Sequence, residues 1–336
     1  MKFYRKLLFP LVPVYYAVTW IRNTFYDMGL IKSVSFNFPV ICVGNLSVGG
    51  TGKTPMIEYL INLLKDDVRV AVLSRGYKRK TKGFYLANNE SSVDILGDEP
   101  YQFYSKFKND IQVAVDSDRV NGIKILRSTH DAPEVILLDD AFQHRKVKAS
   151  FNVLLTTYDA IYTKDYVLPA GNLREPKIGA KRADIIVVTK CPVGLNDVER
   201  DNIVQLIKPL KHQNVFFSSI SYSDSVTSIN SNIKLDEVTD FTLVTGIANA
   251  KPLVNYLKSK QLKFEHLNFP DHYDFIQKDV EVLSKKPLII TTEKDYMRLQ
   301  KQDALKEKLF YLPIQLAIND SSKFDSLVKQ FIASKR

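Results

Sequence analysis

Cysteine is nearly absent from this sequence of 336 residues, which contains only Cys42 and Cys191. The two cysteines lie far apart, so they form neither a metal-binding pair nor a disulfide framework, and their scarcity is typical of a reducing compartment. Internal repeats and low-complexity segments are also missing from the sequence. With 45% hydrophobic residues, the chain exceeds the usual size of a single core, and two domains are expected.

The sequence also lacks an apolar run that would cross a bilayer comfortably. The run at residues 7–21 is interrupted by Pro10 and Pro13, and it has no small-residue cleavage site of a secretory signal. Residues 1–90 contain 13 Lys and Arg but only five Asp and Glu, in a chain of net charge +10. This part is expected to meet nucleic acid, anionic lipid or a phosphorylated substrate. For the N-terminal run itself, two interpretations remain open: an interfacial membrane helix, or a hydrophobic helix packed on the protein.

Strand-like and helix-like segments alternate along most of the chain, and the expected strands are nearly continuous apolar runs. Such strands predict a doubly wound, mostly parallel α/β sheet. A serine-rich stretch interrupts the alternation, which then restarts and predicts a second, smaller α/β domain. The expected strands are residues 68–74, 111–115, 134–140, 151–157 and 184–190. The expected spans are an N-terminal hydrophobic helix (1–30), a larger core domain (31–215), a linker (216–238) and a smaller C-terminal domain (239–336).

The segment SVGGTGKTP, residues 47–55, almost fits the phosphate-binding pattern G-x-x-x-x-G-K-[ST], but Ser47 replaces the first glycine. A strand pattern precedes it and a helix pattern follows it, as this motif requires; a glycine-rich turn with a solvated lysine is the alternative. The glycines let backbone N–H groups converge on an anion at the start of the helix. Lys53 is expected to reach the β- and γ-phosphates of ATP, and Thr54 to bind Mg²⁺. The predicted nucleotide-binding residues are Ser47, Val48, Gly49, Gly50, Thr51, Gly52, Lys53 and Thr54.

Polar side chains follow several of the expected strands, at the sheet edge where parallel sheets hold their ligands. Asp139 and Asp140 end one strand and are candidates for binding Mg²⁺ together with Thr54. An exposed turn with two solvated carboxylates is the alternative. Further candidates, each with an ordinary alternative such as a cap, a turn or a salt bridge, are Arg75, Asp98, Arg119, Arg174 and Glu175.

Eight short segments resemble, in this order, motifs of the tetraacyldisaccharide 4'-kinase family of lipid A synthesis: VGNLSVGGTGKTP, SRGY, GDEP, DDAFQHR, LPAGNLREP, TGIAN, FPDHYDF and TTEKD. A serine at position 47 belongs to that family's pattern. The resemblance implies ATP-dependent phosphorylation of the 4'-hydroxyl of an acylated glucosamine disaccharide 1-phosphate at the cytoplasmic face of the inner membrane. Together with the glycine loop it indicates a P-loop kinase core of the P-loop NTPase type at residues 31–215. The expected cofactors are ATP and Mg²⁺, and the expected partner is a bilayer surface, with no nucleic acid and with a monomeric protein. Tyr273 is a departure, because the family often has a further histidine there.

The resemblance further implies roles for single residues. Asp98 is expected to be the base that deprotonates the sugar hydroxyl, with His272 of the second domain as its partner. A helix cap and a structural turn histidine are the alternatives for these two. Lys53 and Arg119 are expected to stabilise the transferred phosphoryl group. The predicted substrate-binding residues are Arg75, Asp98, Gln143, His144, Arg174 and Glu175.

Other P-loop classes fit the sequence less well. A GTPase needs N-K-x-D to recognise guanine, and TKCP at residues 189–192 lacks the aspartate. A partitioning ATPase of the deviant-loop kind carries an extra lysine where this chain has Val48. A membrane-associated P-loop ATPase or nucleotide-gated adaptor of the partitioning type is the alternative function. It leaves Asp98, Arg119 and the histidine of the second domain without a role.

Overall fold

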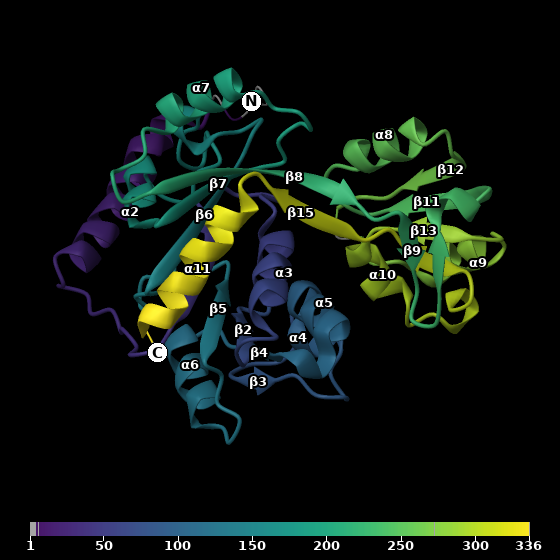
Figure 1. Ribbon diagram of the computed structural model, residues 1–336, viewed down its shortest axis with the longest axis horizontal. Coiled ribbons are helices and arrows are strands. Elements are labelled where there is room, and N and C mark those ends of the chain that lie inside the picture. Colours follow the sequence, from purple (N-terminus) through teal and green to yellow (C-terminus); the bar gives the residue numbers. More distant parts are fainter. Residues whose placement is uncertain (1–4, 6, 272, 336) are drawn as a thin grey trace.

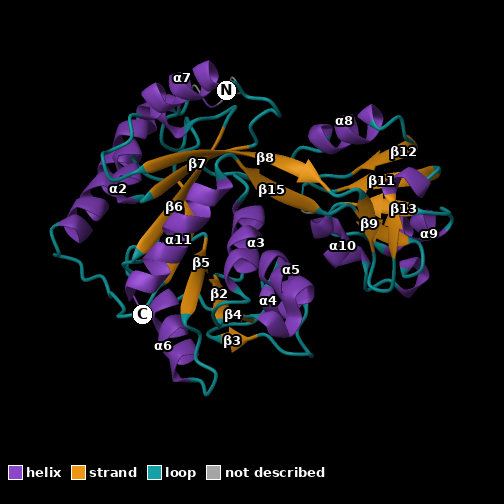
Figure 2. Ribbon diagram, in the orientation of Figure 1, coloured by secondary structure: helices purple, strands orange, loops and turns teal. Residues whose placement is uncertain are grey.

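A nine-stranded sheet forms the larger part of the protein, in a computed structural model that describes residues 5, 7–271 and 273–335. The strand order is β15-β8-β7-β6-β1-β5-β2-β4-β3 (Figures 1 and 2). All neighbours pair in parallel except the two edge strands, β3 and β15. The strands are β1 (Val40–Asn45), β2 (Val70–Ser74), β3 (Tyr85–Leu86), β4 (Gln112–Val115), β5 (Val135–Asp139), β6 (Phe151–Thr157), β7 (Ile185–Thr189), β8 (Asn214–Tyr222) and β15 (Ile314–Ile318).

Helices cover both faces of this sheet, because its central strands are buried on both sides. On one face, α3 (Lys53–Leu64), α5 (Asp98–Phe107) and α11 (Ser321–Lys335) contribute to one apolar cluster. On the other face, α2 (Val12–Asp27), α6 (Arg119–Ser128) and α7 (Asp197–Ile207) pack against a second cluster. Short turns of helix join these elements: α4 (Val93–Leu96), η1 (Phe9–Leu11), η2 (Lys108–Asp110), η3 (Tyr162–Lys164) and η4 (Lys177–Arg182). The predicted doubly wound, mostly parallel fold is confirmed.

A second sheet of six strands, in the order β10-β9-β14-β13-β11-β12, forms the smaller domain on the right of Figure 1. Its helix α8 packs on one apolar cluster, and α9 and α10 pack on another. The elements are β9 (Ser225–Thr227), β10 (Asn232–Lys234), β11 (Asp240–Thr245), β12 (Lys263–Asn268), β13 (Ile289–Thr291), β14 (Leu309–Tyr311), α8 (Lys251–Ser259), α9 (Gln277–Ser284), α10 (Glu293–Leu299), η5 (Leu235–Glu237) and η6 (Asp303–Leu305).

The boundaries between the two domains differ from the predicted spans. The expected linker, residues 216–238, contains the end of β8 and two strands of the smaller sheet. The expected C-terminal domain, residues 239–336, loses its last part, because β15 pairs with β8 and α11 packs on the large sheet. Phe324, Val328 and Ile332 recur at helical spacing and are buried there. The smaller domain is therefore inserted between two neighbouring strands of the core.

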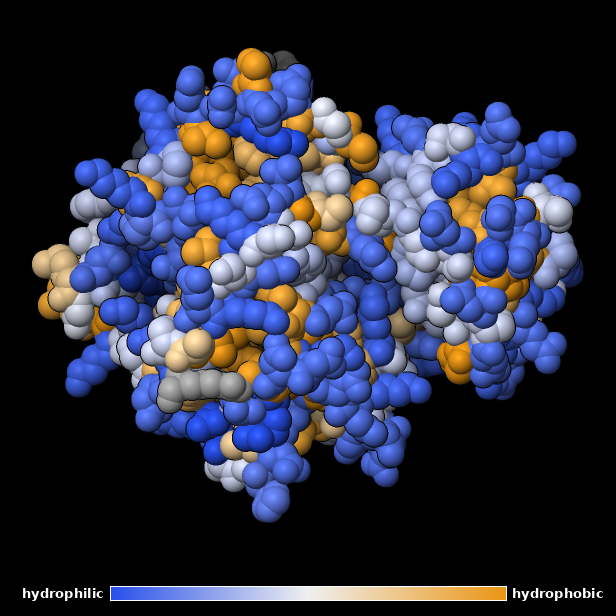
Figure 3. All heavy atoms as spheres, in the orientation of Figure 1, coloured by the Kyte–Doolittle hydropathy of each residue, from blue (hydrophilic) through white to orange (hydrophobic). Residues whose placement is uncertain are grey.

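The N-terminal helix α2 turns Tyr15 and Asn23 toward the protein and exposes most of its apolar side chains. The Tyr15 hydroxyl donates to the carbonyl oxygen of Arg174 at 3.0 Å, and Asn23 is the one residue of α2 that is buried. Apolar surface lies at the left edge of Figure 3, where Figure 1 shows the end of α2. Within the described ranges, no helix is both long and apolar enough to cross a membrane. The exposed large apolar residues of this region are Leu7, Leu8, Phe9, Leu11, Val14, Tyr16, Val18, Trp20, Ile21, Phe25, Met28, Leu30 and Ile31.

Candidate active site

The glycine loop between β1 and α3 has the backbone shape of an anion cradle. Gly49 and Gly52 have φ angles of +108° and +87°, which side-chain-bearing residues rarely adopt. Ser47 does not have a positive φ, so a glycine is not required at this place. The backbone of Ser47 instead forms an isolated antiparallel β-bridge with Leu173, and the side-chain amide of Asn45 donates to the Ser47 carbonyl at 2.6 Å.

The loop has room for phosphate groups on its open side. In the described part of the chain, a Cβ built on Gly49 meets no atom within 4 Å. No described side chain caps the start of α3, so its first N–H groups remain available to an anion. Lys53 begins this helix, and its Nζ lies 3.6 Å from Oδ1 of Asp140. These residues fit the polyphosphate of a nucleotide, with Lys53 and Thr54 at the place where the loop becomes helix.

The paired aspartates lie beside this loop at the carboxyl end of β5. Asp139 is buried, and the Ser74 hydroxyl donates to its Oδ2 at 3.1 Å. Burial, and then the nearby carboxylate of Glu99, raise the pKa of Asp139 to about 7, against the opposite effect of Lys53. Ionisation of the Asp139 carboxyl group therefore costs free energy unless a cation lies close enough to offset its burial. Glu99 was not among the predicted residues, although it follows Asp98 directly in GDEP.

The carboxylates fit Mg²⁺ as part of a shared ligand set. Among the described residues, no group of three or more His, Cys, Asp and Glu side chains holds a metal ion by itself. Mg²⁺ usually binds through one or two carboxylates and takes its other ligands from phosphates and water. Asp139, Asp140 and the Thr54 hydroxyl supply such a partial set at the edge of the phosphate loop.

Arg119 lies buried beneath the aspartates, at the start of α6. Its guanidinium donates to the carbonyl oxygens of Asp116, at 2.9 Å, and Asp139, at 3.4 Å. The helix start itself is capped by Asp118, whose carboxylate accepts from two backbone N–H groups. Burial lowers the pKa of Arg119, which the nearby Asp139 carboxylate opposes. The alternative for Arg119 was a salt bridge at the helix start. In the structure its guanidinium instead contacts backbone carbonyls, one of them that of Asp139, a candidate metal ligand.

His144 and Arg75 lie near Arg119 on the same side of the site. Burial, and then the charge of Arg119, lower the pKa of His144 to about 4. His144 is therefore neutral at pH 7, and its Nε2 is buried without a hydrogen-bond partner in the described structure. The exposed Arg75 adds positive charge at the end of β2 and lowers the pKa values of both neighbours.

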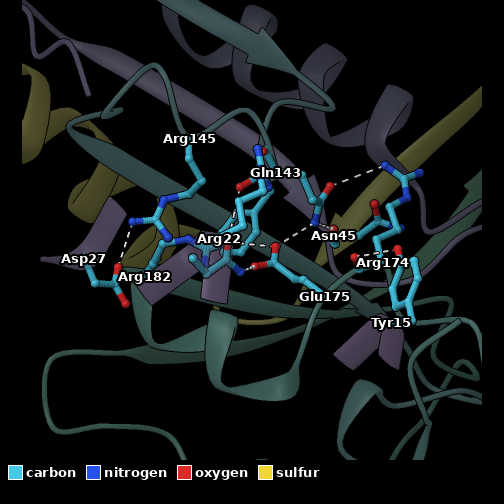
Figure 4. A network of polar contacts seen from close by, with 11 residues as sticks. Tyr15, Arg22, Asp27, Asn45, Gln143, Arg145, Arg174, Glu175 and Arg182 are labelled. Carbon is cyan, nitrogen blue, oxygen red and sulfur yellow. Dashed lines mark hydrogen bonds and ion pairs between the residues drawn. The ribbon is translucent and has the colours of Figure 1, made fainter. Parts of the chain in front are cut away.

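Gln143, Arg174 and Glu175 form a polar network behind the phosphate loop (Figure 4). Gln143 donates to the carbonyl oxygen of Asn45 at 2.8 Å and to Glu175 at 2.9 Å. Arg174 donates to Asp140 at 3.0 Å, so the same aspartate contacts both Arg174 and Lys53.

Glu175 is only 3% exposed in this network. Its carboxylate also accepts hydrogen bonds from Asn23 at 2.6 Å and Arg182 at 2.8 Å. Of the predicted substrate residues, Gln143, Arg174 and Glu175 are thus engaged with other protein groups in this network.

Asp98 lies at the first position of α5, directly after Gly97, which is the N-cap. Its carboxylate accepts a hydrogen bond from Arg298 of α10, in the smaller domain. His272, its predicted partner, lies outside the described residues. The sequence analysis did not single out Arg298. Its position three residues after Asp295 places both on one side of a short helix, and this spacing could have indicated an ion pair between them.

A glycine loop between strand and helix, a lysine at its end and paired aspartates on a neighbouring strand define a P-loop nucleotide-binding protein with the groups needed for phosphoryl transfer. Residues 4–333 match the family model described as tetraacyldisaccharide-1-P 4'-kinase. The chain belongs to this family. The predicted fold class and family are thereby confirmed.

Curated relatives and a solved structure extend the match over nearly the whole chain. A tetraacyldisaccharide 4'-kinase of Flavobacterium johnsoniae is 51% identical, over 99% of this chain and 98% of the relative. One from Bacteroides thetaiotaomicron is 42% identical, over 97% and 93%. The crystal structure of "apo" form LpxK from Aquifex aeolicus in complex with ATP is 34% identical, with a TM-score of 0.79 and coverage of 98% and 99%.

Proposed function

We propose that this protein transfers the γ-phosphoryl group of ATP to the 4'-hydroxyl of a tetraacyl glucosamine disaccharide 1-phosphate, a step of lipid A synthesis. This activity, predicted from the sequence, is that of the family to which the chain belongs. The observation that carries it is the polar site at the carboxyl edge of β1 and β5, where Lys53 of the phosphate loop lies beside two carboxylates. The alternative of a partitioning-type ATPase or adaptor is not favoured.

In the reaction, the 4'-oxygen attacks the γ-phosphorus, and the bond from that phosphorus to the β–γ bridging oxygen breaks to release ADP. Asp98 accepts the hydroxyl proton, with His272 orienting its carboxylate. Lys53 and Arg119 stabilise the negative charge of the phosphoryl oxygens. Asp139, Asp140 and Thr54 would hold Mg²⁺, which would supply positive charge to neutralise the phosphates.

The lipid acceptor reaches this site from a bilayer surface, on which α2 lies with its apolar face. An amphipathic helix of this kind buries its outer side chains at the boundary of headgroups and acyl chains. Val14 and Val18, one helical turn apart, are both 62% exposed, and Trp20 is 47% exposed. The surface is the cytoplasmic face of the inner membrane, where ATP is present. The basic N-terminal region then contacts lipid phosphate groups rather than nucleic acid. The protein acts as a monomer.

The activity is tested by incubating the full-length protein with Mg-ATP and a detergent-solubilised acylated disaccharide 1-phosphate. Mass spectrometry is expected to find one added phosphate, and fragmentation is expected to place it on the sugar distal to the 1-phosphate. A folded Lys53→Ala variant serves as the control and is expected to lose about 100-fold or more in turnover. ATP hydrolysis without a phosphorylated lipid would support the ATPase or adaptor instead.

A further inference from the structure

Helices α5 and α10, one from each domain, lie against each other and are joined by ion pairs at two places. At one end, the Asp98 carboxylate binds Arg298. At the other end, Lys106 Nζ lies 3.2 Å from Glu293 and 2.7 Å from Glu58 of α3. Eight residues separate the two contacts along α5, which is about 12 Å of helix.

Arg298 is held in place by the smaller domain before it reaches Asp98. Its side chain is 9% exposed, and Nη1 lies 3.4 Å from Oδ1 of the fully buried Asp295. Asp295 in turn accepts hydrogen bonds from the Gly246 N–H at 2.8 Å and the Thr292 hydroxyl at 2.7 Å. These residues belong to the TGIAN and TTEKD segments, which the nucleotide site does not use. Their contacts fix the direction in which the guanidinium points.

We propose that Arg298 is a positioning residue for the proton-accepting carboxylate of Asp98. This inference rests on the proposed role of Asp98 as the base. A charge-assisted hydrogen bond from a fixed guanidinium restricts the orientation of the carboxylate that accepts it, here that of Asp98. Phosphoryl transfer depends more on positioning than on strong proton abstraction, so the ion pair's cost in basicity is tolerable. The smaller domain thereby completes the active site of the core.

The competing explanation is that Arg298 only docks the two domains. The contact at the other end of α5 provides a docking ion pair that does not involve Asp98, because Lys106 joins Glu293 of α10 to Glu58 of the core. Glu293→Gln therefore changes a charged contact of α10 with α5 and leaves Asp98 untouched. It is the matched control for substitutions of Arg298.

The experiment measures kcat and the KM for ATP with the full-length protein, Mg-ATP and the solubilised lipid acceptor. Arg298→Met is expected to lower kcat about 100-fold with an unchanged KM for ATP, because positioning of a reacting group is lost. Arg298→Lys is expected to recover about tenfold, because it keeps the charge without the planar fork. Glu293→Gln is expected to stay within about twofold of the unmodified protein. ATP binding to each variant reports that the core remains folded.

A second arm uses an Asp98→Ala background, in which Arg298→Met is expected to cause no further loss, because residues that act as a unit are not additive. Equal losses in Arg298→Met and Glu293→Gln, no recovery in Arg298→Lys, or additive losses in the Asp98→Ala background would each overturn the positioning role. Full activity of the Asp98→Ala variant would show that Asp98 is not the base, and the positioning role of Arg298 would be overturned with it. Failure of the unmodified protein to phosphorylate the lipid would refute the proposed function and is seen before any variant is compared.

Discussion

Asn23 of the N-terminal helix donates a hydrogen bond of 2.6 Å to the carboxylate of Glu175. The same carboxylate accepts from Gln143, whose amide also donates to Asn45 at the end of the strand before the phosphate loop. The helix with the exposed apolar face is thus connected to the nucleotide site through two intervening side chains. Glu175 supports this connection from a buried position.

Replacing Glu175 by glutamine is expected to destabilise the protein by about 2–4 kcal/mol, because the partly buried Arg182 loses its charged partner. Asn23→Ala is expected to cost about 1 kcal/mol, since it removes one hydrogen bond to a carboxylate that keeps two others. Urea unfolding of the three proteins measures both changes. Similar free energies of unfolding for Glu175→Gln and the unmodified chain would contradict a supporting role for this carboxylate.

The outer face of α2 is expected to bind bilayers. Replacing both Val14 and Val18 by glutamine keeps the inward contacts of Tyr15 and Asn23, but removes apolar surface that would enter the headgroup boundary. Vesicle binding is expected to fall about tenfold or more, with ATP affinity unchanged. Co-sedimentation with vesicles that contain anionic lipid measures the change. Val282→Gln, on the exposed surface of the smaller domain, is the control and is expected to have no effect.

Asp139→Asn is expected to raise the Mg²⁺ concentration for half-maximal activity about tenfold or more, because one charged ligand is lost. Asp116→Asn provides the matched control: this buried carboxylate follows β4, two strands away from β5 in the same sheet, and accepts from Asn121 at 2.8 Å. Its Mg²⁺ titration is expected to stay unchanged. If the Asp139→Asn titration is also unchanged, the metal role belongs to Asp140.

The buried Glu293 is expected to make stability depend on pH. Burial, and then the neighbouring Glu58 carboxylate, raise the pKa of Glu293 from 4.5 to about 7, against the effect of Lys106. Between these two pH values the folded chain binds more protons than the unfolded chain, so this group's contribution to the free energy of unfolding falls as pH rises. Glu293→Gln mimics the protonated form and removes that fall. At pH 8 the variant is expected to be more stable by about 3 kcal/mol, and at pH 4 to 5 about equal to the unmodified protein.

Thermal or urea unfolding of both proteins from pH 4 to pH 8 measures the difference. The two stability curves are expected to converge at the acidic end and separate through the range 4.5 to 7. Parallel curves over this whole range would show that Glu293 titrates normally in the folded protein.

The parts of the fold that were predictable from the sequence are those with a local pattern. The glycine loop at residues 47–55, the apolar strands and the aspartates at the end of β5 each depend on neighbours in the chain, and the structure has them where they were expected. The pair Asp98 and Arg298 lies 200 residues apart, and no short pattern connects the two. Likewise, β15 and α11 have periodicities that suit either sheet, so their return to the core depends on tertiary packing.

The orientation of α2 on the protein could not be predicted from the sequence for a related reason. Amphipathic periodicity shows that a helix has two faces, but not which face meets the protein. Here Asn23 and Tyr15 find buried partners on the loop at residues 174–175, so the apolar face is left outside. The two interpretations of the N-terminal run were each incomplete, because one helix packs on the protein while still exposing a broad apolar surface.

The insertion of the smaller domain between β8 and β15 limits how it moves. Beyond Phe217, β8 no longer pairs with β7, and residues 218–222 pair with residues 314–318 of β15 alone. The two covalent connections therefore form one antiparallel ribbon, which Figure 1 shows reaching from the core toward the smaller domain. Such a ribbon bends and twists, but its strands cannot slide past each other without breaking their hydrogen bonds. Any motion of the smaller domain relative to the core that keeps these hydrogen bonds is therefore limited to bending and twisting of this ribbon.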